Sequence, residues 1–307
     1  MVAGMKATGI SAVPGITVGH AHCEAARTGV TLIIPDEPAV MAVEVRGGGP
    51  GTRETDALNP INLVERAHGL ALAGGSVFGL AAGDELALLL SAAGRGLSMG
   101  EGLPPVPVVP AAILFDLTNG GDKNWQMEPP YRRLARAAFA AAGQPGSDGH
   151  GPLGAGFGAR SGSRPGGIGS VSTMLEDGVI VGALIAANSF GEVYADAPSA
   201  GAVAMPKLSR HRDFGRQNVA RQNTVIGAVA TNAPLTRAQA LRVAMVAQSG
   251  LARAVRPVHT QFDGDCLFAL STAAPGRAPV DDIALTIIAT VAADLVAAAV
   301  RQAVGLY

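Results

Sequence analysis

The sequence predicts a single-domain α/β protein in which strands and helices mix along the whole chain. Three observations support this class. The 307 residues are 48% hydrophobic with a formal net charge of -1, which is enough material for one large core. Short β-branched runs and longer helical runs follow one another without an internal repeat or a break between two cores. Glycine is abundant, with 41 residues, while aromatic residues make up 4%, which favours backbone layers packed closely together.

The first elements are short strands followed by a glycine-rich turn. Segments 30–36 and 40–45 are β-branched and bounded by turn residues, and we expect them to pair. The glycines of 46–56 allow a tight backbone path. The Asn59-Pro60 pair is typical of a helix start, so a helix is predicted over 63–72.

Helices and strands also follow one another in the middle of the chain. An Ala-Gly-Gly-Ser break at 73–76 precedes a helix that begins at Phe78 and ends near Gly94. A strand is predicted over 105–117, and an alanine-rich helix over 131–142. Glycine then dominates 143–169, which we interpret as an ordered loop beside a functional site, although composition alone is equally typical of a flexible loop.

The last part of the chain begins with a buried strand at 179–187, which ends at Asn188 and a turn. Segment 195–222 is polar and without periodicity, which indicates an exposed segment. The next predicted strand, 224–230, starts abruptly after it.

A capping box of Thr236 and Gln239 opens a helix that should stop at Gly250. A final strand, 266–271, and a buried terminal helix, 283–304, complete the predicted fold.

Composition excludes several classes of function. The 23 basic and 24 acidic residues nearly cancel and form no basic run, so nucleic-acid binding is not expected. The two cysteines are far apart, and no cluster has metal-ligand spacing, so neither a metal nor another cofactor is expected. Residues 1–18 do not have the pattern of a secretory signal, which favours a cytoplasmic location. Asp294 and Arg301 interrupt the apolar terminal helix, so no membrane span is predicted.

Thr224 is the candidate nucleophile. A threonine hydroxyl needs a base within hydrogen-bond reach, and a free α-amine on the same residue supplies one, with a pKa near ~8. Thr224 gains that amine only if the bond after Asn223 is cut by attack of its own hydroxyl on the Asn223 carbonyl. The cut would divide the domain into 1–223 and 224–307, which should stay associated because neither buries its apolar surface alone.

Polar residues at neighbouring strand ends are the candidate partners of Thr224. If the strands at 224–230 and 266–271 are neighbours, the Asp263-Gly264-Asp265 turn lies beside Thr224. One aspartate would then accept and return a proton, and pairing the two would raise the pKa of one. Asn188 would donate to the developing oxyanion. Each motif taken alone is more often a structural turn, and His259 is interpreted as an anchor for the approach to that turn.

Five ordered motifs together resemble a known family, the P1 family of self-processing aminopeptidases and amidases. The family includes the L-aminopeptidase/D-esterase, the β-peptidyl aminopeptidases and the nylon-oligomer hydrolases. The motifs that carry the resemblance are RGGGPGTRETDALNP at 46–60, LAGGSVFGLAAGDE at 72–85, the strand end at Asn188, RQNTVIGAVATN at 221–232 and HTQFDGDCLFALST at 259–272.

The resemblance implies a four-layer αββα sandwich of the N-terminal-nucleophile amidohydrolase type, assembled as a homo-oligomer, commonly a tetramer. It implies Thr224 as the nucleophile, Asn223 as the residue left at the cut, and Asn188 as the oxyanion donor. Asp263 and Asp265 become the acidic partners. The substrate would be a small or oligopeptide amide, and no cofactor is needed.

Threonine at the cut followed by Asp-Gly-Asp is most similar to the nylon-oligomer (6-aminohexanoate oligomer) hydrolase branch. Two positions depart from that branch: Phe115 stands where a tyrosine is expected, and Arg164, after Ser163, stands near an expected lysine. Both are candidate site-lining residues, together with Gly75 and Ser76 of the second motif.

Alternatives to an amidase of that branch stay open at this stage. One is an aminopeptidase/D-esterase of the same family, and another is an acyltransferase similar to ornithine acetyltransferase. A third, from a different class, is an uncut ligand-binding protein whose Gly-Gly-Gly run binds an anion, although the run has no nucleotide-binding pattern.

Overall fold

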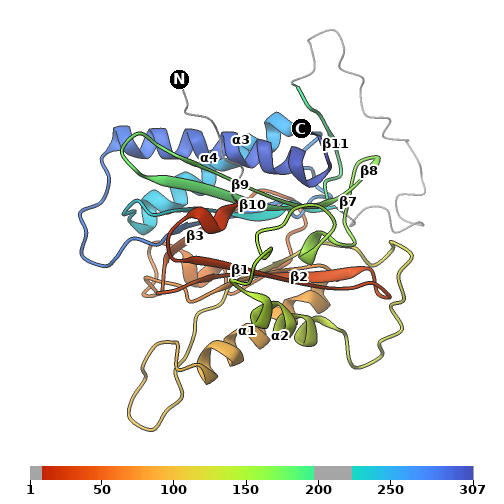
Figure 1. Cartoon of the computed structure of the whole chain (residues 1–307), viewed down its shortest axis with the longest axis horizontal. Helices are drawn as coiled ribbons and strands as arrows, with labels where there is room; N and C mark the ends of the chain where they lie inside the picture. Colours follow the sequence, from red (N-terminus) through yellow and green to blue (C-terminus); the bar gives the residue numbers. More distant parts are fainter. Residues whose placement is uncertain (1–8, 197–222, 307) are drawn as a thin grey trace.

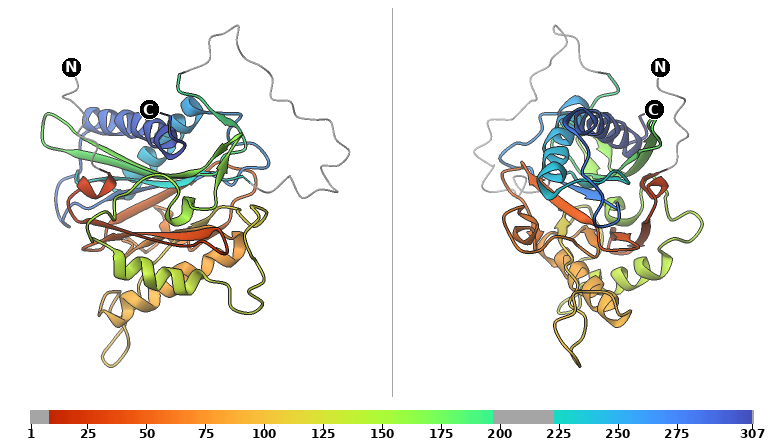
Figure 2. Two further views of the ribbon diagram at one scale, coloured as in Figure 1. Left: turned by 45° about the vertical axis from the view of Figure 1, so that its right-hand side comes forward. Right: turned by 90° about the vertical axis from the view of Figure 1, so that its left-hand side faces the viewer.

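The protein is a stack of four layers, a helix pair, two sheets and a second helix pair (Figure 1). The structure is a computed structural model that describes residues 9–196 and 223–306. Two further views show the helix pairs on opposite outer faces of the two sheets (Figure 2). The predicted αββα sandwich is confirmed. Most of the segment 195–222, predicted to be exposed, lies outside the described residues.

The first sheet carries α1 (Ala81–Ala92) and α2 (Tyr131–Ala141) on its outer face. Strand β2 is buried at every position because both its faces are covered. Alternation along the strand divides its side chains: Leu32 packs toward the helices and Ile33 toward the second sheet. In sheet order the strands are β1 (Ile16–Cys23), β2 (Thr28–Pro35), β5 (Leu70–Ala73), β6 (Ala111–Ile113) and β4 (Thr52–Arg53).

The second sheet carries α3 (Arg237–Ala254) and α4 (Asp282–Ala303) on its outer face. Strands β12 and β14 are parallel neighbours and α3 connects them, which confirms the predicted strand-helix-strand unit. In sheet order the strands are β3 (Val40–Val45), β14 (Cys266–Ser271), β12 (Ile226–Thr231), β10 (Ile180–Ala187) and β9 (Gly167–Met174).

Helix α3 begins at the predicted capping box, where Thr236 Oγ1 accepts from the Gln239 N–H and the Gln239 side chain accepts from the Thr236 N–H. The prediction that it stops at Gly250 is wrong, because the helix continues to Ala254. Gly250 is buried against α4, and a Cβ added there would lie 2.1 Å from the Ala293 carbonyl oxygen. The glycine therefore serves close helix packing and not termination.

Helix α4 matches the predicted terminal helix. Of the helices in the described residues, it is the one long and apolar enough to cross a membrane. Its buried side, which includes Ala292, Val296 and Val300, belongs to the core formed with α3 and the second sheet. The charged residues Asp294 and Arg301 engage Arg253 and the Tyr194 carbonyl of the protein itself.

Two predictions about the first third of the chain are wrong. Segments 30–36 and 40–45 do not pair, because β2 pairs with β1 and β5 while β3 pairs with β14 in the other sheet. The predicted helix at 63–72 is absent, and its last residues form the central strand β5. Asn59 accepts from the Ile61 N–H and makes a turn, and the fully buried run of β5 has no alternation to distinguish it from a helix.

The glycine-rich segment 143–169 contains more structure than predicted. Its end belongs to β9, where a Cβ added at Gly169 would lie 1.8 Å from the Ala299 carbonyl oxygen of α4. The predicted strand at 105–117 is reduced to β6. The remaining short elements are η1 (Ile10–Ala12), η2 (Asp56–Leu58), η3 (Ser76–Leu80), η4 (Gly154–Gly156), β7 (Arg160–Ser161), β8 (Arg164–Pro165), β11 (Glu192–Val193) and β13 (Val255–Arg256).

Candidate active site

The Asn223–Thr224 bond lies just before the central strand β12, where Thr224 is buried with 4% of its surface exposed. The Thr224 hydroxyl donates to the Asn223 carbonyl oxygen at 2.5 Å. The same carbonyl oxygen accepts a second hydrogen bond, from the Gly264 N–H at 3.1 Å. The Thr224 N–H donates to the Asn188 carbonyl oxygen at 2.6 Å. The end of β10 therefore holds the nitrogen of this bond, and the turn before β14 holds its carbonyl oxygen.

The parallel register of β12 and β14 brings the Asp-Gly-Asp turn to Thr224. Ile226 is opposite Cys266, and a bridge pairs Asn223 with Asp263, so Gly264 lies next to the nucleophile candidate. A Cβ added at Gly264 would lie 2.7 Å from Thr224 Oγ1, closer than real Cβ contacts allow. The turn and Thr224 meet as the sequence predicted, and only glycine fits between them.

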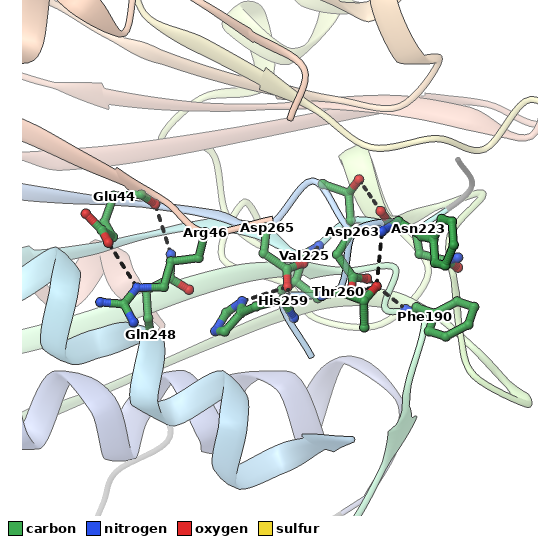
Figure 3. Close-up of polar contacts among 12 residues, drawn as sticks. Glu44, Arg46, Phe190, Asn223, Val225, Gln248, His259, Thr260, Asp263 and Asp265 are labelled. Atoms are coloured by element: carbon green, nitrogen blue, oxygen red, sulfur yellow. Dashed lines mark hydrogen bonds and ion pairs between the residues drawn. The ribbon is translucent and has the colours of Figure 1, made fainter. Parts of the chain in front are cut away.

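Asp263 is buried at the turn and accepts three hydrogen bonds (Figure 3). Its Oδ2 accepts from the Thr260 N–H at 2.8 Å and hydroxyl at 2.7 Å, and its Oδ1 accepts from the Phe190 N–H at 3.3 Å. Burial, and then the charge of Asp265, raise the pKa of Asp263 to about 6. This is the raised pKa expected for one member of a carboxylate pair.

Asp265 holds the residue that follows the nucleophile. Its Oδ1 accepts from the Val225 N–H at 2.8 Å, and its Oδ2 accepts from the His259 N–H at 3.0 Å. The His259 ring Nδ1 lies 2.9 Å from the same Oδ2 (Figure 3). His259 has a positive φ of 55°, which directs both its backbone N–H and its ring at the carboxylate. It therefore anchors this turn, as the sequence indicated.

Asn188 ends β10 and is 2% exposed. Its main-chain carbonyl meets Thr224, while its side-chain amide donates to the Phe115 carbonyl oxygen at 3.2 Å. Its Oδ1 accepts from the Arg160 N–H at 2.9 Å. The donor that the structure places on the Asn223 carbonyl oxygen is the Gly264 N–H, which the sequence analysis did not identify. The register of the two parallel strands is the signal that could have found it.

The Gly-Gly-Gly run supports the turn with its backbone. The Gly47, Gly48 and Gly49 N–H groups donate to the carbonyl oxygens of Asp265, Thr260 and Asp263, respectively, at 3.2, 3.1 and 2.8 Å. These donors are used inside the protein, so the alternative in which this run binds an anion is wrong. A Cβ added at Gly47 would lie 2.3 Å from the Asp265 nitrogen, which explains the need for glycine.

Two pockets open on either side of the Asn223–Thr224 bond. Thr224 lines a pocket of about 810 Å³, whose described lining contains no charged residue. We call it the uncharged pocket. Asn223 lines a pocket of about 390 Å³ together with Arg27, Asp116 and Arg160. We call this one the arginine pocket.

The remaining candidate residues divide between these pockets. Phe115 lines both pockets and Ser76 lines the uncharged pocket. Gly75, with a φ of 81°, donates its N–H to Asp116 Oδ1 at 2.8 Å behind the pocket wall. Arg164 is exposed on the β7–β8 hairpin and is not among the described residues that line either pocket. The arginines at the site are instead Arg27 and Arg160, which the sequence analysis did not select.

Metal ligands are not grouped in the described ranges: within 9–196 and 223–306, no three His, Cys, Asp or Glu side chains could together hold an ion. The polar groups around Thr224 are a hydroxyl, backbone N–H donors and two carboxylates. Such a set is suited to acyl transfer from a carbonyl to the hydroxyl.

Comparisons with known proteins agree with this geometry. The model of peptidase family S58 matches residues 8–305. An uncharacterized aminopeptidase of Mycobacterium leprae is 42% identical, covering 86% of this chain and 78% of that protein. A 6-aminohexanoate-oligomer endohydrolase of a Kocuria species is 30% identical, covering 84% of this chain and 73% of that protein.

Two solved structures have the same fold. A β-aminopeptidase of a Burkholderia species superposes with a TM-score of 0.74 at 24% identity, covering 99% of this chain and 88% of that one. The L-aminopeptidase D-Ala-esterase/amidase of Ochrobactrum anthropi, described as a variant of the Ntn hydrolase fold, has a TM-score of 0.73 at 22% identity, covering 99% and 87%. The resemblance drawn from the five motifs is confirmed: this chain belongs to peptidase family S58 and is an amide hydrolase.

Proposed function

We propose that this amide hydrolase cuts itself between Asn223 and Thr224, and that the new amino-terminal Thr224 is the nucleophile in turnover. The observation that carries the proposal is the pair of hydrogen bonds on the Asn223 carbonyl oxygen, from the Thr224 hydroxyl at 2.5 Å and the Gly264 N–H at 3.1 Å. The first brings the hydroxyl beside the carbonyl it would attack. The second is in position to stabilise the negative charge that attack creates.

In the proposed self-cleavage, the Thr224 oxygen forms a bond to the Asn223 carbonyl carbon. The carbon–nitrogen bond then breaks, and the nitrogen takes up the proton that the hydroxyl gave up. The result is an ester between Asn223 and Thr224 Oγ1 with a free α-amine on Thr224. One water molecule hydrolyses the ester and leaves a carboxylate on Asn223.

Turnover repeats the same chemistry on a substrate amide. The Thr224 amine takes the hydroxyl proton, the substrate acyl group is transferred to Thr224 Oγ1, and the leaving amine takes the proton before water releases the acid. Asp265 positions the nucleophile strand through the Val225 N–H. Asp263, with its pKa raised to about 6, is the carboxylate able to exchange a proton near neutral pH.

The two pieces should remain one protein after the cut. Strands β12 and β14 belong to the segment after Thr224 and lie between β10 and β3, which belong to the segment before it. Separating the pieces would open the middle of the second sheet and expose its core. We further propose assembly into a homotetramer, which multi-angle light scattering of the purified protein would test.

The proposed substrates are amides of short peptides or ω-amino-acid oligomers, in line with the 6-aminohexanoate-oligomer endohydrolase among the relatives. The relative named an aminopeptidase keeps an amino-terminal exopeptidase as the second candidate. A panel of L-, D- and β-amino-acid amides beside 6-aminohexanoate oligomers separates them. Hydrolysis of the oligomers at internal or carboxyl-terminal bonds supports the first candidate, whereas release of single free residues from amino termini alone supports the second.

An acyltransferase would share the acyl-enzyme but pass the acyl group to an amine. Incubation with acetylornithine and glutamate tests this directly. Acetyl transfer at a rate above amide hydrolysis would contradict the proposed hydrolase, and water as the exclusive acceptor supports it.

A further inference from the structure

The two pockets beside Thr224 differ in charge, and that difference specifies which end of a substrate each one takes. We propose that the uncharged pocket binds an acyl group without an ammonium, and that the arginine pocket binds the free carboxylate of the leaving amino acid. The preferred substrates would then be N-acylated amino acids or the carboxyl-terminal amide of longer oligomers. This inference rests on the proposed function and names its substrate class.

The uncharged pocket is unsuited to a free ammonium. Val77, Leu80 and Ile113 supply much of its apolar wall, and in the uncut chain none of the described residues that line it carries a charge. The proposed cut adds only the Thr224 amine, which when protonated would repel a second ammonium. Asp263 and Asp265 are buried and bound to backbone N–H groups of the turn, so they do not line it. An ammonium that left water for this pocket would lose hydration without gaining a counter-ion, which is costly. A neutral aliphatic acyl chain has no such cost.

The arginine pocket has the opposite character. Arg27 is exposed at its edge, and its guanidinium makes neither a hydrogen bond nor an ion pair within the described part of the chain. Arg160 is also exposed, and its guanidinium contacts only the Gly162 and Ser163 carbonyl oxygens, at 3.2 Å each, among the described residues. Guanidinium groups bind carboxylates through paired N–H donors.

Asp116 is the one acidic residue in the described lining of this pocket, but its carboxylate is buried. It is 3% exposed, and its Oδ1 accepts from the Gly75 N–H. The charge of Lys123 lies close enough to act on the Asp116 carboxyl. In the uncut chain the exposed charges of the pocket are therefore the two guanidinium groups. The proposed cut would add one carboxylate, on Asn223, which the two guanidinium groups still outnumber.

Chain direction decides which part of the substrate each pocket receives. In a peptide or an ω-amino-acid oligomer, the free carboxylate belongs to the amine side of every amide bond. A carboxylate at Arg27 and Arg160 therefore places the leaving amino acid in the arginine pocket. The acyl side then extends past Thr224 into the uncharged pocket, with Phe115 forming the wall common to both.

The test compares three compounds that differ at one end each: N-hexanoylglycine, its amide N-hexanoylglycinamide, and 6-aminohexanoylglycine. We expect kcat/KM of the cleaved wild-type enzyme to be highest for N-hexanoylglycine. Replacing the carboxylate by an amide should lower kcat/KM about tenfold or more, as loss of a charge-assisted hydrogen bond does. An ammonium on the acyl chain should also lower it.

Arg27→Ala and Arg160→Ala are expected to reduce the acid-to-amide ratio of kcat/KM about tenfold. Arg164→Ala is the matched control, because Arg164 is an exposed arginine of the same hairpin as Arg160, and its ratio should equal that of the wild type. Self-cleavage of each variant reports that it is folded.

The outcomes separate this inference from the function on which it rests. Equal acid-to-amide ratios in the wild type and both arginine variants, or a wild-type preference for 6-aminohexanoylglycine, would overturn the inference and leave the hydrolase intact. An uncut chain that hydrolyses none of the three compounds would overturn both.

Discussion

The Thr224 hydroxyl and the Asn223 carbonyl oxygen are 2.5 Å apart, and the Gly264 N–H binds the same oxygen from the other side at 3.1 Å. The parallel pairing of β12 with β14 creates this arrangement, because it puts the Asp-Gly-Asp turn beside the first residues of the central strand. The chemistry of the site therefore depends on strand register as much as on side chains.

Gly264→Ala should stop self-cleavage while leaving the fold intact. The added Cβ would lie 2.7 Å from Thr224 Oγ1, so either the hydroxyl or the turn must move. Alanine keeps the N–H, but this movement takes the N–H or the hydroxyl out of line with the Asn223 carbonyl. We expect the rate of cleavage to fall by at least about 100-fold, as it typically does when one oxyanion donor is lost. Gel analysis of purified protein over time measures it.

Gly49→Ala is the control for that variant. Gly49 also contacts the turn, but its added Cβ would meet nothing closer than 3.7 Å. Cleavage of Gly49→Ala at the wild-type rate is expected. Equal rates for Gly264→Ala and the wild type would contradict the role of this turn.

The stability of Asp263→Asn relative to the wild type should rise with pH, while its activity falls. Asparagine replaces one of the two acceptor oxygens by a donor, so the pH dependence of the difference is the test and not its absolute value. The folded-state pKa of Asp263 is raised to about 6, so the stabilisation gained by holding it protonated is complete below about pH 4 and is lost as the pH rises through about 6. Asparagine does not ionise, so the stability of the variant should gain on that of the wild type between about pH 4 and pH 6. We expect about 1 kcal/mol after screening by water in the adjoining pockets.

Denaturant unfolding at pH 4 and pH 7, in a Thr224→Ala background that keeps the chain in one piece, measures this difference. The same substitution with Thr224 present should slow turnover about 100-fold. A difference in stability between Asp263→Asn and the wild type that stays constant from pH 4 to pH 7 would contradict the raised pKa of Asp263.

His259→Ala should weaken the hold on Asp265 and slow self-cleavage. It removes the ring contact of 2.9 Å and leaves a positive φ of 55° that alanine disfavours. The expected loss of stability is about 1–3 kcal/mol, the cost of a hydrogen bond to a charged group.

His259→Asn is the informative comparison, because asparagine tolerates a positive φ and carries an N–H donor. We expect it to restore most of the cleavage rate that His259→Ala loses. If both variants cleave like the wild type, Asp265 does not need His259 to position the nucleophile strand.

Gly250→Ala should destabilise the protein even though alanine favours helices. The gain in helix propensity is about 1 kcal/mol, but the added Cβ would lie 2.1 Å from the Ala293 carbonyl oxygen, and overpacking of this kind costs about 1–3 kcal/mol. Thermal unfolding should show a lower Tm. Ser249→Ala, at the exposed neighbouring position, should leave the Tm unchanged, and a rise in Tm for Gly250→Ala would contradict the close packing of α3 on α4.

The elements predicted well from sequence are those with strong local signals. The capping box at Thr236, the amphipathic α2 and the apolar α4 are each determined by residues that are neighbours in the sequence. The errors at 63–72 and Gly250 share one origin, which is tertiary contact. Strand β5 is buried on both faces and lacks alternation, and Gly250 is required by a helix far away in sequence.

The site residues also divide into those with a local signal in the sequence and those placed by tertiary contacts. Thr224, the two aspartates and their meeting could be predicted, because one strand-helix-strand unit determines that geometry. The Gly264 N–H could not be identified from residue type, because every residue except proline has a backbone N–H. Arg27 lies in the turn between β1 and β2, and Arg160 begins β7 within the glycine-rich segment. The paths of both segments depend on tertiary packing and do not follow from local sequence.

The mass of the purified protein under denaturing conditions tests the central claim most directly. We predict two species, residues 1–223 and residues 224–307, with threonine as the first residue of the smaller one. We expect Thr224→Ala to give one uncut, inactive chain and Thr224→Ser to give the same two pieces as the wild type. A wild-type protein that stays in one piece after long incubation and still hydrolyses amides would contradict this account.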